Sequence, residues 1–212
     1  MLIVGASGHA KEILDVLSKN DLKFELNFFD NVTPDLPHKL YDTFRIIRTD
    51  DEVREVFKYD PSYILGVGGS EIRYKLCLKM NSLGGRLTSV ISSLAIMGDF
   101  NIELGEGVNI MHNALISNDV HIGKGTLVNA RSSIHHDVKV GQFCEISPGA
   151  ILTGGVQIGD FTSIGSGVVV LPKIKIGKNV VVGAGAIVTK NLADNIVAIG
   201  APAKAKVSKY LD

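Results

Sequence analysis

The stretch that decides the fold is residues 134–158, IHHDVKVGQFCEISPGAILTGGVQI, in which every sixth residue is aliphatic. The same spacing continues in both directions without a break, from residue 104 to residue 188. The aliphatic positions are Leu104, Ile110, Ile116, Ile122, Val128, Ile134, Val140, Ile146, Leu152, Ile158, Ile164, Val170, Ile176, Val182 and Val188. A period of six fits neither an α-helix nor the alternation of a simple strand, and it is typical of the hexapeptide repeats of a parallel β-helix.

Glycine adds a second period. The chain has 23 glycines, and five of them are spaced 18 residues apart, at Gly105, Gly123, Gly141, Gly159 and Gly177. Eighteen residues are three hexads, so one coil should be a triangle of three short strands with glycine at a sharply turning corner. Coils stack about 4.8 Å apart, which places residues 18 apart above one another and stacks Phe143 on Phe161. We expect five regular coils over 104–188, one or two less regular ones over 87–102, and a C-terminal cap that starts at residue 201.

Residues 1–85 follow a different pattern, in which short apolar strands alternate with amphipathic helices. Strands are expected at 2–4, 24–29, 46–47 and 63–67, and helices at 9–19, 50–57 and 71–83. This alternation predicts a small Rossmann-like α/β domain with a parallel sheet. The chain therefore divides into that domain at 1–85 and the β-helix with its cap at 86–212.

Charge and composition exclude several classes of protein. Lysine and arginine number 22, as do aspartate and glutamate, so the chain lacks the basic excess of a nucleic-acid binder. It has no run of 18 apolar residues for a membrane span and no signal-like N-terminus. Cys77 and Cys144 alone do not form a disulfide framework. We expect a cytoplasmic protein without a membrane span and without a nucleic-acid partner.

The 18-residue register makes His136 a catalytic candidate. Gly154 follows His136 by 18 residues and Gly155 follows Asp137, so the histidine should face an opening about 5 Å tall above it. The alternative is that the glycine pair merely turns a corner and that His135 and His136 are an exposed pair. His112 and His121 are expected on the surface. No two histidines of the β-helix share a column, and no metal is expected.

Two features of the N-terminal region suggest a ligand. Gly5-x-x-Gly8 lies between a strand and a helix, where a phosphate could approach the helix N-terminus, and His9 lies in the first turn of that helix. Asp30 ends the second strand, where a carboxylate could reach a ribose or an amino group. The alternative is a plain tight turn with a surface acid, because the full dinucleotide fingerprint is absent.

The chain resembles the hexapeptide-repeat sugar acyltransferases, the family that includes sialic acid O-acetyltransferases, UDP-bacillosamine N-acetyltransferase and GDP-perosamine N-acetyltransferase. The resemblance covers essentially the whole chain. The segments that carry it are IVGASGHAKEILDVL, FFDN, GVGGSEIRYKL, HHDVKVGQFCEISPGAILTGGVQIG, VVGAGAIVTKN and VAIGAPAK.

The resemblance implies a left-handed β-helix, an exception to the usual right-handed crossover, in a homotrimer with active sites between subunits. It implies acetyl-CoA as cosubstrate along the β-helix and the nucleotide of an activated amino sugar on the N-terminal domain. It implies His136 and Asp137 as catalytic residues. The implied substrate-binding residues are Ser7, Gly8, His9, Asp30, Gly68 and Asn129, and the implied acetyl-CoA contacts are Gly154, Ser166 and Ala184.

The sequence departs from the family pattern at three places. Glu145 stands where family members often have a histidine, in the acetyl-CoA region. Asn31 replaces the second acid of a frequent Asp-Asp pair, and Gly69-Ser70 replaces a frequent Asn/Asp-Asn pair. These last two departures lie in the nucleotide-sugar region, so the base and the sugar stay open.

The predicted function is acetyl transfer from acetyl-CoA to the amino group of a UDP- or GDP-linked amino sugar, for glycan or surface polysaccharide synthesis. His136 would act as general base, Asp137 would fix its tautomer, and a backbone N–H near Gly154 would stabilise the oxyanion. Two alternatives stay open. One is O-acetylation of a sialic acid or related sugar, and the other is a trimeric scaffold without turnover.

Overall fold

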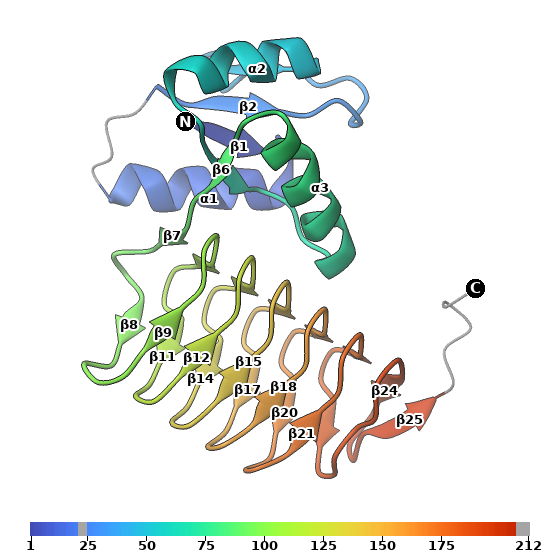
Figure 1. Ribbon diagram of the computed structural model, residues 1–212. Helices are drawn as coiled ribbons and strands as arrows, with labels where there is room; N and C mark the ends of the chain where they lie inside the picture. Colours follow the sequence, from blue (N-terminus) through green and yellow to red (C-terminus); the bar gives the residue numbers. More distant parts are fainter. Residues whose placement is uncertain (21–24, 207–212) are drawn as a thin grey trace.

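The computed structural model describes residues 1–20 and 25–206 of the chain (Figure 1). The N-terminal domain is a six-stranded sheet of order β3-β4-β2-β1-β5-β6, in which β3 alone runs antiparallel to its neighbour. Its strands are β1 (Leu2–Val4), β2 (Asn27–Phe29), β3 (Lys39–Leu40), β4 (Phe44–Ile47), β5 (Ser62–Leu65) and β6 (Arg86–Leu87). Its helices are α1 (Gly8–Lys19), α2 (Asp50–Tyr59) and α3 (Ser70–Ser82).

The expected alternation of strands and helices is confirmed, with shifted ends. The second strand begins only at Asn27, and Phe24, its expected first residue, lies outside the described residues. Helix α2 begins where Thr49 and Glu52 form a reciprocal capping box. Strand β6 pairs with β5, so the N-terminal sheet takes its last strand from residues that follow Gly85.

Helices cover both faces of this sheet. Val53 and Phe57 of α2 and Cys77 and Met80 of α3 pack on one face in a buried cluster. Helix α1 packs on the other face through Ala10, Ile13, Val16 and Leu17, and this second cluster includes Val90, Met111 and Leu127 of the β-helix. The N-terminal domain is therefore a three-layer α/β unit that shares part of its core with the coils, and Figure 1 shows α1 and α3 on its coil-facing side.

The second domain is a triangular stack of two-residue strands in three parallel sheets. Face 1 contains β7 (Val90–Ile91), β10 (Asn109–Ile110), β13 (Leu127–Val128), β16 (Glu145–Ile146), β19 (Ser163–Ile164), β22 (Val181–Val182) and β24 (Val197–Ile199). Face 2 contains β8 (Ile96–Met97), β11 (Leu115–Ile116), β14 (Ser133–Ile134), β17 (Ile151–Leu152), β20 (Val169–Val170) and β23 (Ile187–Val188). Face 3 contains β9 (Glu103–Leu104), β12 (His121–Ile122), β15 (Lys139–Val140), β18 (Gln157–Ile158) and β21 (Lys175–Ile176).

The predicted register is confirmed. From β9 to β23, strand partners are 18 residues apart, as in the pair Ile134 and Leu152. Of the fifteen aliphatic positions all except Leu104 are buried, and Leu104 packs against the same core while partly exposed. One less regular coil, β7 to β9, precedes the regular ones. The Phe143 and Phe161 rings stack with centroids 5.9 Å apart, and Tyr74 of α3 packs edge-on against both.

The cap differs from the coils. Strand β25 (Lys204–Lys206) turns back and pairs antiparallel with β24, which ends the parallel stack. The polar residues that the sequence assigns to the rest of the cap, 207–212, lie outside the described residues.

The glycines spaced 18 residues apart were expected because of a sharp backbone turn, but the structure gives a different reason for them. None of them has a positive φ. A Cβ on Gly123 would lie 2.6 Å from the backbone carbon of Gly141 in the next coil, so glycine is required by close approach. The left-handed residues come two positions later, in a column occupied by glycine, phenylalanine and asparagine: Gly107, Gly125, Phe143, Phe161 and Asn179.

This close approach predicts a stability effect. Gly123→Ala should destabilise the protein by about 1–3 kcal/mol, because a methyl group is forced against the backbone of the next coil. Chemical unfolding followed by circular dichroism measures the loss. Gln142→Ala, on an exposed side chain of the next coil, is the control and should change stability by less than about 0.5 kcal/mol. Equal stability of the two variants would show that the corner has room for a side chain.

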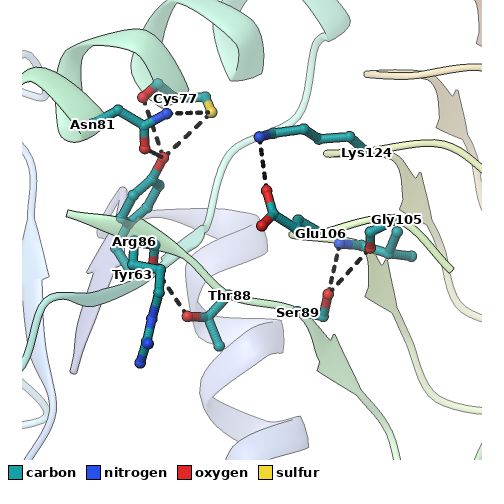
Figure 2. A network of polar contacts seen from close by, with 10 residues as sticks. Tyr63, Cys77, Asn81, Arg86, Thr88, Ser89, Gly105, Glu106 and Lys124 are labelled. Atoms are coloured by element: carbon teal, nitrogen blue, oxygen red, sulfur yellow. Dashed lines mark hydrogen bonds and ion pairs between the residues drawn. The ribbon is translucent and has the colours of Figure 1, made fainter.

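A polar network surrounds the segment that joins the domains (Figure 2). Tyr63 donates to Asn81 Oδ1 at 2.7 Å inside the N-terminal domain. Ser89 accepts from the Val108 backbone N–H at 3.1 Å, and Lys124 pairs with Glu106 at 2.8 Å on adjacent coils. The linker is thus fixed to the first coils by hydrogen bonds.

Candidate active site

His136 and Asp137 lie at the corner between faces 2 and 3, just after β14. The His136 Nδ1 and Asp137 Oδ2 atoms are 2.7 Å apart, and both side chains are about two-thirds exposed. Because a carboxylate only accepts, Nδ1 carries the hydrogen and Nε2 stays free as a base. Asp137 has φ 61°, a left-handed conformation that aspartate tolerates better than most residues. The backbone turn therefore holds the carboxylate against the imidazole.

The expectation of an open space above His136 is wrong, because the imidazole ring itself fills that space. A Cβ on Gly154 would lie 2.5 Å from His136 Cε1 and 2.6 Å from Nε2. The imidazole itself therefore occupies the room that the missing side chain leaves. Gly155 N–H donates to the His136 carbonyl at 2.9 Å, which ties the two coils together at this corner. Glycine at 154 fixes the ring position, whereas the sequence pattern suggested a channel for a ligand.

The N-terminal turn presents exposed backbone. Ser7 is the N-cap of α1 but makes no side-chain cap hydrogen bond, and the position of a Cβ on Gly8 has no atom within 4 Å. Asp30 is buried and accepts hydrogen bonds from Ala6 N, Val32 N, and the Thr33 backbone N–H and hydroxyl. Burial alone would raise the pKa of Asp30, but these donors hold it below its usual value. Asp30 thus joins the two loops at the carboxyl ends of β1 and β2.

His9 points from α1 toward the β-helix. Its Nε2 accepts from Asn109 Nδ2 at 3.3 Å, and its Nδ1 lies 3.2 Å from Glu12 Oε2. Asn109 also donates to the Leu65 carbonyl at 2.8 Å. Burial lowers the pKa of His9 below 6.5, although Glu12 opposes this shift. His9 is therefore neutral at pH 7 and anchors the turn before α1 to face 1.

A pH dependence follows. At pH values near the unfolded pKa of His9, the unfolded chain binds a proton on this residue and the folded chain does not. His9 therefore contributes stability that is fully present above its unfolded pKa and is lost as the pH falls through and below that value. We expect the free energy of unfolding to decrease between pH 7 and pH 5.5. His9→Gln should flatten that decrease, as measured by urea unfolding at the two pH values. An unchanged slope in the variant would assign the dependence to other groups.

Gly68, Gly69 and Glu145 meet across the domains. Gly69 N–H donates to Glu145 Oε2 at 2.7 Å, and a Cβ on Gly68 would lie 3.4 Å from the same oxygen. Next to them Arg73 is fully buried and donates to the carbonyls of Leu65, Val67 and Gly125. Sequence reasoning did not assign Asn109, Arg73 or Glu145 to the site. For Asn109 and Glu145, which lie in the β-helix, the available signal was an amide or charged residue within an otherwise hydrophobic pattern. Arg73 gave no such signal.

The remaining predicted residues lie at the other edge of face 2, the corner between faces 1 and 2. Asn129 is buried there, and its backbone bonds Ile146 and Ser132. Ser166 and Ala184 are exposed and stacked on adjacent coils, where Gly185 N–H donates to the Ser166 carbonyl. Within one chain the structure thus brings His136, Asp137 and Gly154 together at one corner, and places Asn129, Ser166 and Ala184 at another.

The expectation for His112 is wrong. Its side chain is only 18% exposed, because it bridges Ser92 Oγ at 2.5 Å and Asp15 Oδ2 of α1 at 2.9 Å across the domain junction. His121 is half-exposed and pairs with Glu103, as expected of a surface residue. Cys77 and Cys144 are both free and buried.

The described ranges, 1–20 and 25–206, contain neither a cluster of metal ligands nor a helix of membrane-spanning character. No group of three or more His, Cys, Asp or Glu side chains there could hold a metal ion. None of the helices in the same ranges is long and apolar enough to cross a membrane.

Comparisons with known proteins agree with this arrangement. Residues 1–80 match the family model of the PglD N-terminal domain, and residues 119–154 and 155–190 match the bacterial transferase hexapeptide model. No curated protein sequence matches the chain significantly.

Solved structures resemble it over nearly its whole length. PerB from Caulobacter crescentus, solved with CoA and GDP-perosamine, is 29% identical with a TM-score of 0.87, over 97% of this chain and 96% of that one. A histidine-to-asparagine variant of perosamine N-acetyltransferase from the same organism gives 28% identity and a TM-score of 0.89, over 98% and 96% of the two chains. The acetyltransferase domain of PglB from Neisseria gonorrhoeae, solved with acetyl coenzyme A, is 26% identical with a TM-score of 0.86, over 97% and 98%.

The hexapeptide coils and the matches to them define an acyltransferase of the left-handed β-helix class. With its PglD-type N-terminal domain, the chain belongs to the hexapeptide-repeat sugar acyltransferases. The resemblance seen in the sequence and the fold class expected from it are confirmed.

Proposed function

We propose that this enzyme transfers the acetyl group of acetyl-CoA to the amino group of a nucleotide-linked amino sugar, in glycan or surface polysaccharide synthesis. The observation that carries the proposal is the His136–Asp137 pair, held over Gly154 with Nε2 free. The similarity of the whole chain to an enzyme solved with CoA and GDP-perosamine supports the choice of both substrates.

The chemistry needs one base and one oxyanion donor. The sugar nitrogen forms a bond to the acetyl carbonyl carbon, and the bond from that carbon to the CoA sulfur breaks. The acceptor binds as an ammonium: His136 Nε2 takes one proton and so frees the lone pair of the nitrogen, and the proton that the nitrogen loses after attack goes to the leaving thiolate. Asp137 stabilises the imidazolium that forms. A backbone N–H near Gly154 stabilises the oxyanion, an effect typically worth about 3 kcal/mol.

We assign the nucleotide sugar to the N-terminal domain and the junction with face 1. Ser7 and Gly8 offer open backbone at the α1 N-terminus, where a phosphate is favoured. Gly68 lies at the carboxyl end of the neighbouring strand β5, and ligands of open α/β sheets bind at that edge. His9 and Asp30 hold the turn before α1 in place. Asn129 follows β13, one coil after the coil that contains Asn109.

The separation of the site between two corners supports a homotrimer. His136 and Gly154 lie at one edge of face 2, and Ser166 and Ala184 lie at the other. The outward side chains of face 2 are mainly apolar: Ile96, Leu115, Ser133, Ile151, Val169 and Ile187. Packing such faces around a threefold axis brings the His136 corner of one subunit to the Ser166 corner of the next, with acetyl-CoA between them. Both free cysteines agree with a reducing, cytoplasmic location.

Thiol release from acetyl-CoA tests this function. The acceptors are UDP-, GDP- and dTDP-linked amino sugars and free sialic acid. We expect release only with a nucleotide-linked amino sugar. Release with sialic acid alone would make the enzyme an O-acetyltransferase, and no release with any acceptor, from a folded trimer, would leave a scaffold.

A further inference from the structure

Glu145 is a half-buried carboxylate that uses only one of its two oxygens. It projects outward from face 1, on β16, toward the N-terminal domain. Its Oε2 accepts from Gly69 N–H at 2.7 Å, at the N-terminus of α3. No residue in the described ranges donates a hydrogen bond to Oε1, and none forms an ion pair with this carboxylate. A carboxylate oxygen in such a place retains its capacity to accept a hydrogen bond.

The free oxygen faces Gly68. A Cβ on Gly68 would lie 3.5 Å from Glu145 Oε1, and its three nearest neighbours would all be atoms of the Glu145 carboxylate. In the described residues, no other side chain comes nearer to that position than the Glu145 carboxylate. A ligand that passes over Gly68 meets the free oxygen of Glu145.

The same junction contains two buried polar atoms without partners. Arg73 Nη2 and Asn109 Oδ1 form no hydrogen bond with any described residue, although the rest of both side chains is engaged and both donate to the Leu65 carbonyl. Leu65 ends β5, the strand that leads into Gly68. Unsatisfied buried groups of this kind mark a place that a water or a ligand completes. This observation is independent of Glu145 and concerns the same domain junction, where Arg73 lies within range of the Glu145 charge and Asn109 lies two coils before Glu145 on face 1.

Arg73 does not neutralise Glu145 by direct contact. The Nε and Nη1 atoms of Arg73 donate hydrogen bonds to three backbone carbonyls. The Arg73 and Glu145 side chains form no ion pair within 4 Å. Burial lowers the pKa of Arg73 to about 10, and the negative charge of Glu145 opposes that shift. Among the described residues, the Glu145 carboxylate therefore has no direct ion-pair partner at the domain junction.

We propose that Glu145 is the specificity-determining residue that recognises the acceptor amine, through a hydrogen bond from the sugar nitrogen to Oε1. This inference rests on the proposed function and names the acceptor class of its site. A sugar ammonium carries three N–H donors and a positive charge, whereas a hydroxyl offers one uncharged donor. A charge-assisted hydrogen bond therefore favours an amino sugar over the matched hydroxyl sugar.

The hydrogens balance in the reaction. Of the three on the ammonium, one goes to His136 of a neighbouring subunit and one goes to the CoA thiolate. The third stays on the product amide and keeps its hydrogen bond to Glu145. Glu145 itself neither gains nor loses a proton, so it is a binding residue and not a second base.

Glu145→Gln is a matched test. The glutamine carbonyl keeps the bond from Gly69 N–H, and its NH2 group replaces the free oxygen with a donor. Calorimetric titration compares a nucleotide amino sugar, starting with GDP-perosamine, with the same nucleotide sugar carrying a hydroxyl in place of the amine. We expect the wild type to prefer the amine about tenfold or more and the variant to lose that preference. Ser163→Ala, which alters the neighbour of Glu145 that contacts Ser70, should keep it.

The comparison separates the possible failures. General damage to the site weakens both ligands equally and leaves their ratio unchanged, and an unchanged ratio in Glu145→Gln overturns the assignment. Thiol release by the wild type tests the proposed function separately. An active wild-type enzyme whose variant still prefers the amine contradicts only the role of Glu145, whereas a wild type that acetylates no amino sugar contradicts the proposed function.

Discussion

His136→Ala is expected to lower kcat by about a hundredfold or more, the range of a lost general base. The side chain is exposed and makes one hydrogen bond, to Asp137, so its removal leaves the hydrophobic core intact. Binding of acetyl-CoA and sugar should change little, and the loss should fall on kcat more than on KM. Steady-state thiol release with purified enzyme measures both constants.

His135→Ala is the control for that variant, because it removes a neighbouring histidine that contributes no hydrogen bond to the pair. We expect it to keep near-wild-type turnover. If His136→Ala also keeps near-wild-type turnover while its fold is intact, the base lies elsewhere.

Asp137→Asn should lower kcat by about tenfold to a hundredfold. An amide can offer its own N–H to His136 Nδ1, which favours the tautomer that carries its hydrogen on Nε2, and an Nε2–H cannot act as a base. Asparagine tolerates the left-handed φ of 61° at this position, so the turn is preserved.

Asp119→Asn is the matched control for this variant. Asp119 lies one coil earlier in the same left-handed column, with φ 57°, and bonds Asn101 instead of a histidine. It should leave kcat unchanged. A loss of similar size in both variants would trace the effect to the corner and not to the His136–Asp137 pair.

Much of the β-helix could be predicted from the sequence, because each hexad repeats one physical requirement. An inward aliphatic side chain every six residues buries the core of every coil, and the 18-residue register then places His136 over Gly154 without further information. The left-handed corner column was less predictable, because it holds glycine, phenylalanine and asparagine in turn and shows no single residue type.

The domain junction could not be predicted. His112, Asp15 and Ser92 come from three separate segments and meet only because α1 packs against the first coils. Arg73 lies in a helix with charged neighbours along the sequence, and nothing local indicates that it is buried. Glu145 was visible as an unusual residue, but its bond to Gly69 depends on how the two domains pack. Periodicity reports on repeated local contacts, and these contacts are neither repeated nor local.

The most direct test of the account is the product itself. Wild-type enzyme is incubated with acetyl-CoA and GDP-perosamine or another nucleotide-linked amino sugar, and the sugar nucleotide is analysed by mass spectrometry and NMR. We predict a gain of one acetyl group on the sugar nitrogen, together with one free CoA thiol per product. Acetylation at a hydroxyl, or recovery of every amino sugar unchanged, would contradict the central claim.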